Sequence, residues 1–193
     1  VMTAALMRRF GVNVVAAANG ARFSVPASEC YVNPPSIDVE ADASSATYPL
    51  AFAALSPGLT VTVSNLGSSS LQGDASFALL LERIGCKVQQ TAETTTVTGP
   101  ARLTAIPELN MADQTDAFLT MAVVAACCEP GQTTRIVGIA NQRVKECDRI
   151  AAVAEGLRKC GVRAEELEDG IAVTAGFASN VSERKLIRCF KDH

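Results

Sequence analysis

The sequence carries one pattern three times, as ALMRRFGVNVVAAANGARFSVP (Ala5–Pro26), LLLERIGCKVQQTAETTTVTGP (Leu79–Pro100) and EGLRKCGVRAEELEDGIAVTAG (Glu155–Gly176). In each copy a helical stretch ends at a glycine, the residue that most readily takes the left-handed conformation after a helix: Gly11, Gly85 and Gly161. A short strand, a polar turn and a second strand follow, and two turns carry strong hairpin signals, Asn19-Gly20 and Asp169-Gly170. A period of roughly 75 residues is too long for a solenoid and suits a small α/β unit.

The segments between these copies repeat as well. Helical patterns cover Ala43–Leu55, Gln72–Ile84, Asp116–Cys128 and Val144–Cys160, and strand patterns cover Leu59–Val63, Leu109–Ala112 and Thr133–Ile139. We therefore predict an α/β (α+β) fold of repeated β-α-β-α-β-β units, in which two helices cover one face of a mixed sheet. The first copy is only the end of a unit, and a further element is expected to start within Phe177–His193, so the repeat is incomplete at both ends.

A proline-containing stretch separates the first copy from the rest. Pro26–Ala41 holds three prolines and few helix formers, which is typical of a linker between two lobes. At the end of this stretch, Val39–Ala43 is expected to be a crossing strand or a hinge.

Composition and charge exclude several classes of protein. Hydrophobic residues make up 48% of the chain and charged residues 19%, with a mean hydropathy of +0.21, so the chain buries a core and is not disordered throughout. The 17 basic and 20 acidic residues leave a net charge of −3, which disfavours nucleic acid as a partner. The longest apolar run, Ala117–Cys128, is well short of the roughly 20 residues that cross a bilayer, so no membrane partner is expected.

The seven cysteines do not predict a metal site. No CxxC occurs and the single histidine is His193, so the usual spacing of zinc ligands is missing. Free cysteines act as small hydrophobic residues in reducing compartments. We interpret them as reduced thiols of a cytoplasmic protein, and we expect no metal.

The word NQRVKECDR (Asn141–Arg149) opens the last predicted helix. Lys145 and Arg149 are four residues apart and are predicted to share one helix face, and Arg143 comes just before them. Like charges at this spacing repel, and the N-terminus of a helix is itself partly positive. The crowding favours a binding site for a phosphate or a carboxylate.

The same word also fits a solvated helix face. Glu146 and Asp148 offset part of the positive charge, and Asn141 can simply cap the helix. From the residues alone, the anion site and the solvated face both stay open.

Asp116 stands at the start of the apolar helix that is predicted over Asp116–Cys128. Aspartate in a first turn ordinarily caps the helix or pairs with its dipole, as Asp42 is expected to do before Ala43–Leu55. At a helix end that faces a cleft, the same carboxylate can act as a general base or orient a hydroxyl group.

Four words together resemble 5-enolpyruvylshikimate-3-phosphate (EPSP) synthase: NQRVKECDR, TDAFLT (Thr115–Thr120), VEADASSATYPLAFAAL (Val39–Leu55) and SSLQGD (Ser69–Asp74). GIANQRVKECDRI and TDAFLT are most similar to the synthase domain of the fungal pentafunctional AROM polypeptide, and the order of the words agrees along nearly the whole chain. The resemblance implies a fold of two lobes, each built of three β-α-β-α-β-β units. Residues 1–39 would then be the end of one lobe, and residues 40–193 would be the larger part of the second lobe, with two units.

The resemblance also implies an activity, namely transfer of the enolpyruvyl group of phosphoenolpyruvate to the 5-hydroxyl of shikimate 3-phosphate with release of phosphate. This step belongs to the shikimate pathway of aromatic amino acid biosynthesis. Asp116 matches the base of the family, and Asn141 and Lys145 match residues that contact shikimate 3-phosphate. Glu146 matches the glutamate that moves the proton at the methylene group, and Arg149 matches an arginine that binds phosphoenolpyruvate. The resemblance implies no organic cofactor and no metal.

Other groups of the family have no counterpart in this chain. Its N-terminal lysine, its phosphoenolpyruvate loops and its serine-serine-glutamine motif are missing, and FKDH (Phe190–His193) stops where the arginine of the family's D-H-R motif is expected. Because catalysis needs groups that are held from both lobes, we expect the chain alone to be nearly inactive and to need the remainder of the synthase polypeptide. The alternatives are a non-catalytic α/β module or, among enzymes, a protein like UDP-N-acetylglucosamine enolpyruvyl transferase.

Overall fold

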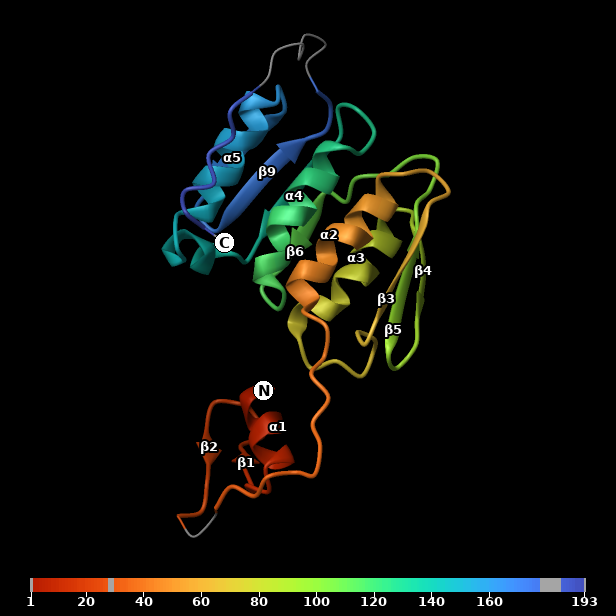
Figure 1. Ribbon diagram of the computed structural model, residues 1–193. Coiled ribbons are helices and arrows are strands. Elements are labelled where there is room, and N and C mark those ends of the chain that lie inside the picture. The colour runs from red at the N-terminus through yellow and green to blue at the C-terminus, as the bar shows by residue number, and fades with distance from the viewer. Residues whose placement is uncertain (1, 28–29, 178–184, 193) are drawn as a thin grey trace. The chain divides into compact units, whose positions relative to one another are not determined.

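A computed structural model describes residues 2–27, 30–177 and 185–192 of the chain (Figure 1). The chain divides into two compact units, Val1–Glu40 and Ala41–His193.

The first unit is a helix followed by a short hairpin. α1 (Met2–Arg9) is followed by Gly11, whose φ of +80° is the left-handed conformation predicted for the glycine after a helix. β1 (Val15–Ala16) pairs antiparallel with β2 (Phe23–Ser24), and Gly20 in the connecting loop also has a positive φ. A small core of three buried residues, Ala4, Val12 and Val14, packs the helix against the segment that leads into the hairpin.

Among its described residues, the second unit contains four α-helices and two sheets. The helices are α2 (Ala43–Ala54), α3 (Phe77–Arg83), α4 (Phe118–Ala126) and α5 (Arg149–Lys159). The smaller sheet has the order β3-β5-β4, with strands Thr60–Ser64, Thr94–Thr98 and Lys87–Gln90. The larger sheet has the order β6-β7-β9-β8, with strands Glu108–Asn110, Thr133–Val137, Gly170–Thr174 and Arg163–Leu167. Three short 3-10 turns complete it: η1 (Gly73–Ser76), η2 (Thr115–Ala117) and η3 (Ala140–Val144).

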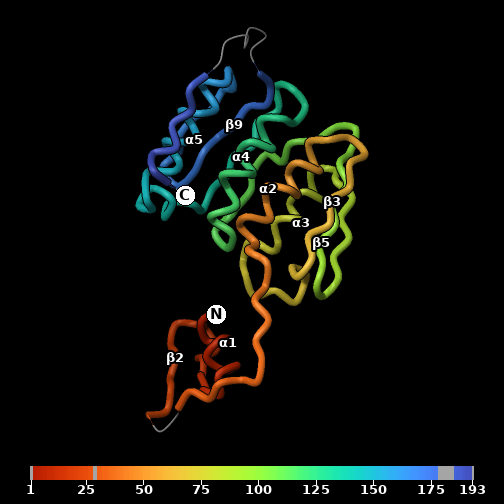
Figure 2. The backbone as a smooth tube through the Cα atoms, viewed as in Figure 1, coloured from red at the N-terminus to blue at the C-terminus, as the bar shows by residue number. Residues whose placement is uncertain are grey.

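The helices of this unit lie side by side in the order α3, α2, α4 and α5, and each sheet packs one face on two of them (Figures 1 and 2). Along β5, Thr95 and Val97 are buried toward the helices, whereas Thr96 and Thr98 on the other face hydrogen-bond to threonines of β3. This alternation follows from the two-residue period of a strand. The architecture confirms the predicted α/β (α+β) class.

One continuous core joins the two repeats of this unit. α4 is buried on nearly all sides, which explains why its sequence is almost wholly apolar. Within this core, the hydroxyl groups of Thr47 on α2 and Thr120 on α4 lie 2.8 Å apart and hydrogen-bond. The two repeats therefore share one hydrophobic core and are not separate domains.

Among the described residues, no strand precedes α2 in the first of these two repeats. β6 runs parallel to β7, as a β-α-β-α-β-β unit requires, but the described residues between β2 and α2 form no strand. Val39–Ala43 is therefore not a crossing strand, and the prediction is wrong on this point. The Ala41 N–H donates to the Asn65 carbonyl at 2.9 Å, but a strand needs a ladder of such bonds.

The hairpin at Asp169-Gly170 forms, but its turn lies one residue earlier than predicted. Leu167 pairs with Gly170, so the two-residue loop is Glu168-Asp169 and Gly170 begins β9. Gly170 is needed there for space, because a Cβ atom at this position would lie 1.9 Å from the Ile136 carbonyl oxygen. The close approach of β7 and β9 thus depends on a missing side chain.

We expect Gly170→Ala to lower the free energy of unfolding by about 1–3 kcal/mol, because the added methyl group forces β7 and β9 apart. Gly156→Ala in α5 is the matched control, since its Cβ would meet Ile187 Cγ2 at an ordinary 3.6 Å. Alanine favours helix over glycine, so this control gains up to about 1 kcal/mol. Urea unfolding measures both changes, and equal stability of the two variants would contradict the steric argument.

We expect the reactivity of each cysteine thiol to depend on its burial. Burial raises the pKa of Cys86 and of Cys128 to about 11, whereas Cys30 and Cys189 are exposed. At pH 8 an aromatic disulfide reagent should therefore modify Cys30 and Cys189 quickly, and Cys86 and Cys128 only after unfolding. Mass spectrometry of the native, briefly treated protein identifies the modified thiols. Fast modification of Cys86 would show that its environment is open to solvent.

Candidate functional site

Two parallel strands bring the predicted site residues to one edge of the larger sheet. β6 and β7 are parallel, so their carboxyl ends lie at the same edge, where α/β sheets commonly place binding groups. η2 follows β6, η3 follows β7, and these two turns contact each other. Thr115 and Asp116 are thereby brought beside the segment Asn141–Arg149.

The carboxylate of Asp116 is where the cationic residues meet. Its Oδ1 atom accepts a hydrogen bond from Gln142 Nε2 at 2.8 Å and another from Arg149 Nη1 at 3.1 Å. Lys145 Nζ lies 3.4 Å from the same oxygen. The Asp116 side chain is 40% exposed, so a molecule in solution can still reach it.

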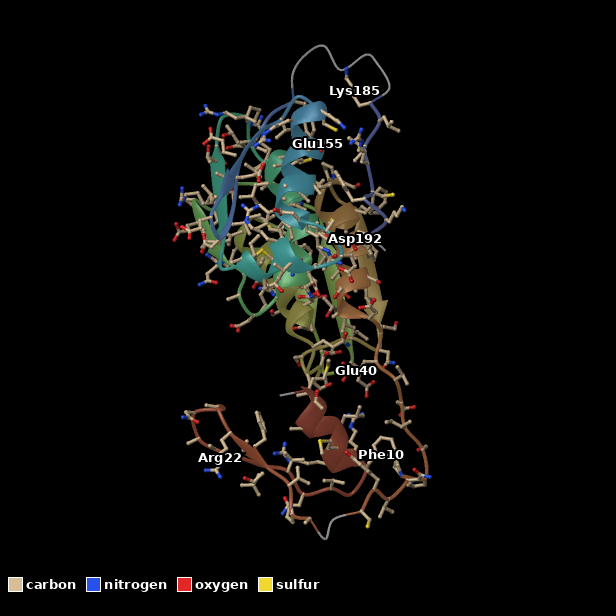
Figure 3. The ribbon with its side chains drawn as sticks, turned by 90° about the vertical axis from the view of Figure 1, so that its left-hand side faces the viewer. Phe10, Arg22, Glu40, Glu155, Lys185 and Asp192 are labelled. Atoms are coloured by element: carbon tan, nitrogen blue, oxygen red, sulfur yellow. The ribbon has the colours of Figure 1, made fainter. Side chains whose placement is uncertain are left out.

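Arg149 is almost enclosed, with a side chain only 9% exposed. Its Nε and Nη2 atoms donate to the two oxygens of Asp192 at 2.7 and 2.9 Å, and Nη2 also donates to Glu146 at 2.8 Å. Nη1 donates to Asp116 and, at 3.3 Å, to Gln142 Oε1. A guanidinium has five N–H groups, so these five bonds use them all. Figure 3 labels Asp192. The hydrogen bond from Arg149 to the Asp192 carboxylate raises the pKa of Arg149.

Asn141 and Gln142 hold η3 against η2. Asn141 Nδ2 donates to Thr115 Oγ1 at 3.2 Å, so it does not cap the following helix as one interpretation held. Gln142 is completely buried and donates from Nε2 to the same Thr115 oxygen at 3.0 Å. Leaving a buried amide group unpaired costs about 1–3 kcal/mol, so these bonds fix the contact between the two turns.

The last helix begins later than the predicted Val144–Cys160. α5 starts at Arg149 because Asp148 is a strong N-cap, whose carboxylate accepts from the Ala151 N–H at 3.0 Å. Lys145 lies before the helix in extended backbone, so it does not share a helix face with Arg149, and the prediction is wrong on this point. The two cations meet at Asp116 because the chain turns between them.

The crowding of positive charge is relieved inside the protein. Arg143 donates to Asp148 at 2.8 Å and pairs with Glu166 at 3.4 Å, away from Asp116. Lys145 and Arg149 have three carboxylates around them, namely those of Asp116, Glu146 and Asp192. Charge crowding by itself therefore does not require a bound anion.

Asp74 lies next to this group, although the sequence patterns did not single it out. Its carboxylate accepts from Ser44 Oγ at 2.6 Å and from the Ala117 N–H, which links both repeats to the start of α4. Burial raises the pKa of Asp74, and the negative charge of Asp116 acts in the same direction. Gly73 allows the close packing, because a Cβ atom there would lie 2.0 Å from the Asp113 carbonyl oxygen.

The structure brings all five predicted site residues into this one group, either at Asp116 or on its partners: Asp116, Asn141, Lys145, Glu146 and Arg149. Sequence reasoning missed Gln142 and Asp192. Asp192 lies in FKDH, and the resemblance of FKDH to the start of the family's D-H-R motif was the signal that could have indicated it. His193 lies outside the described residues. Gln142 carried no signal, since a glutamine between Asn141 and Arg143 is typical of an exposed polar segment.

Within residues 2–27, 30–177 and 185–192, no three His, Cys, Asp or Glu side chains are grouped so that they could hold a metal ion. No helix in this part of the chain has the length and apolar character to cross a bilayer. The group itself consists of carboxylates, cations and amide side chains. Lys145 can hold an anionic group, Arg149 can do so where a ligand replaces one of its protein carboxylates, and Asp116 can accept a proton.

Comparison with known proteins gives relatives along the whole chain. Residues 1–193 match the family model of EPSP synthase (3-phosphoshikimate 1-carboxyvinyltransferase). The chain is 55% identical over 177 residues to the pentafunctional AROM polypeptide of Komagataella phaffii and 52% identical over 192 residues to that of Schizosaccharomyces pombe. These matches cover 89% and 95% of this chain, but only 11% and 12% of the relatives.

Solved structures give the same result. EPSP synthase from Acinetobacter baumannii is 26% identical, with a TM-score of 0.75 over 92% of this chain and 41% of that one. The enolpyruvyl transferase NikO from Streptomyces tendae, at 17% identity and a TM-score of 0.63, shares the fold. The family model matches residues 1–193, and together with these likenesses this match shows that the chain belongs to the EPSP synthase family.

Proposed function

We propose that this chain supplies part of an EPSP synthase that transfers the enolpyruvyl group of phosphoenolpyruvate to the 5-hydroxyl of shikimate 3-phosphate and releases phosphate. The observation that carries the proposal is the meeting of Lys145 and Arg149 on the Asp116 carboxylate, at the edge of the larger sheet. The family model matched over residues 1–193 supports shikimate 3-phosphate, and not a UDP-sugar, as the acceptor. The reaction belongs to the shikimate pathway of aromatic amino acid biosynthesis.

Asp116 is the residue that holds the acceptor hydroxyl and removes its proton. The oxygen of that hydroxyl adds to the carbon of phosphoenolpyruvate that bears the phosphate, while Glu146 delivers a proton to the methylene carbon. Glu146 then takes one proton back from the methyl group while phosphate leaves, and the double bond is restored. Because Asp116 Oδ1 is already engaged by Gln142 and Arg149, the carboxylate is held in one orientation before the hydroxyl arrives.

Lys145 and Asn141 bind shikimate 3-phosphate, and Arg149 binds phosphoenolpyruvate. Both reactants carry several negative charges, so fixed cations stabilise the charge that develops during transfer. All five N–H groups of Arg149 are taken by protein groups, so this residue binds a ligand carboxylate only by exchanging it for Asp192 or Glu146. The exchange keeps the guanidinium paired with a carboxylate, and the displaced carboxylate must then be hydrated or find another partner.

The protein works with the remainder of a synthase polypeptide, since the chain spans 11–13% of its AROM relatives and 41% of the A. baumannii enzyme. Residues 1–39 are the end of one lobe and residues 40–193 the larger part of the second. The seven free cysteines suit the reducing cytoplasm.

Asp116→Asn tests the proposed base. Phosphate release is followed with shikimate 3-phosphate and phosphoenolpyruvate, in the chain supplemented with segments that complete the synthase. We expect Asp116→Asn to lower kcat by about 100- to 10,000-fold, because the amide cannot accept the hydroxyl proton. Asp113→Asn removes the same charge from an exposed position three residues earlier and should leave the rate unchanged.

Parental activity of Asp116→Asn would remove Asp116 from the role of base. Phosphate release with UDP-N-acetylglucosamine in place of shikimate 3-phosphate would assign the chain to the sister reaction. Without the complementing segments, the chain is expected to release phosphate no faster than the Asp116→Asn variant, because groups from both lobes hold the reactants.

A further inference from the structure

Gln142 is the one fully buried glutamine in the part of the chain that the structure describes, and both ends of its amide are used. The Nε2 atom donates to Thr115 Oγ1 at 3.0 Å and to Asp116 Oδ1 at 2.8 Å. The Oε1 atom accepts from Arg149 Nη1 at 3.3 Å. A single side chain thus touches both the carboxylate and the guanidinium of the group.

The amide has one orientation that satisfies its neighbours. If the group were turned over, its oxygen would face the Asp116 carboxylate and its NH2 group would face the Arg149 guanidinium. Both contacts would bring like partial charges together at hydrogen-bond distance. The amide of Gln142 therefore matches the charges of its two neighbours, with its NH2 group toward the Asp116 carboxylate and its oxygen toward the Arg149 guanidinium.

The η3 turn directs this residue inward against ordinary hydropathy. Gln142 is fully buried, whereas Val144, two residues later in the same turn, is 83% exposed. Exposing a valine costs free energy, and burying an amide does so too unless the amide is hydrogen-bonded. The turn keeps the arrangement because Gln142 finds partners on η2 and α5.

We propose that Gln142 is a positioning residue, which sets the orientation of Asp116 and the plane of Arg149 relative to each other before any substrate binds. The assignment rests on the proposed function, in which Asp116 removes a proton and Arg149 binds phosphoenolpyruvate. Gln142 touches neither reactant. It acts by holding the base and the cation at a fixed separation, so that the hydroxyl group and the enolpyruvyl carbon are aligned for reaction.

The first experiment needs no substrate. In the chain itself, labelled with ¹⁵N, hydrogen exchange of the side-chain amide of Gln142 is measured by NMR. Replacing Asp116 by alanine should speed this exchange about tenfold or more, since one of the two acceptors that hold the amide is lost. The side-chain amide of Gln132, bonded to Glu129 at the other end of β7, should not change. Unchanged exchange at Gln142 would overturn the proposal.

The second experiment measures phosphate release in the completed synthase. Gln142→Met keeps the length of the side chain and removes its hydrogen bonds, and kcat should fall about 100-fold while KM for shikimate 3-phosphate changes little. Gln132→Met is the matched control, because it removes a glutamine that also joins two segments, and its kcat should stay parental. Parental kcat in Gln142→Met would overturn the proposal.

Gln142→Glu separates positioning from a purely structural role. The shape is kept, but a second carboxylate now faces Asp116, so the acidic limb of the pH–rate profile should move upward by about one pH unit or more. A profile that coincides with that of the parent would also overturn the proposal. If the parental synthase releases no phosphate, the proposed function fails, and the exchange experiment alone decides whether Gln142 positions Asp116 and Arg149.

Discussion

The guanidinium of Arg149 is a nearly buried positive charge, and the rest of the site is arranged to compensate it. An uncompensated buried charge costs several kcal/mol, so a guanidinium at 9% exposure needs partners for its donors. Its partners come from η2, from η3, from the turn before α5 and from the segment that contains Asp192. One side chain therefore ties two distant segments, those of Asp116 and Asp192, to its own stretch of chain, and any ligand carboxylate must compete with carboxylates of the protein.

The repeat explains why these segments meet. Because β6 and β7 are parallel, the turns that follow them emerge at the same edge of the sheet and bring Asp116 beside Gln142. The preceding repeat contributes as well, through Asp74, which accepts from the N–H of Ala117 at the start of α4. The shared core, with the buried bond between Thr47 and Thr120, keeps the two repeats in register. The geometry of the site thus depends on packing between repeats as much as on its own residues.

Gln142 and Val144 show where reasoning from residue types fails. Their burial is the opposite of what hydropathy favours, because Gln142 is fully buried and Val144 is 83% exposed, and the helix predicted over Val144–Cys160 begins only at Arg149. The cause is Asp148, which caps α5 and delays the helix, so that the preceding residues form a 3-10 turn with a different periodicity. A cap worth about 1 kcal/mol therefore redirects the side chains that surround Asp116.

The sequence by itself determined the class of fold, the glycines that end helices and the hairpins. It also indicated the candidate site residues at the starts of two predicted helices, namely Asp116 and residues within Asn141–Arg149. These features follow from local rules, since periodicity, turn chemistry and a distinctive word act within a few residues of one another. Only the tertiary structure decided which groups touch. The pairing of Asp192 with Arg149, the enclosure of Gln142 and the missing strand at Val39–Ala43 depend on contacts across the chain. Such contacts are set by packing and by the need to satisfy buried charges, which no local pattern encodes.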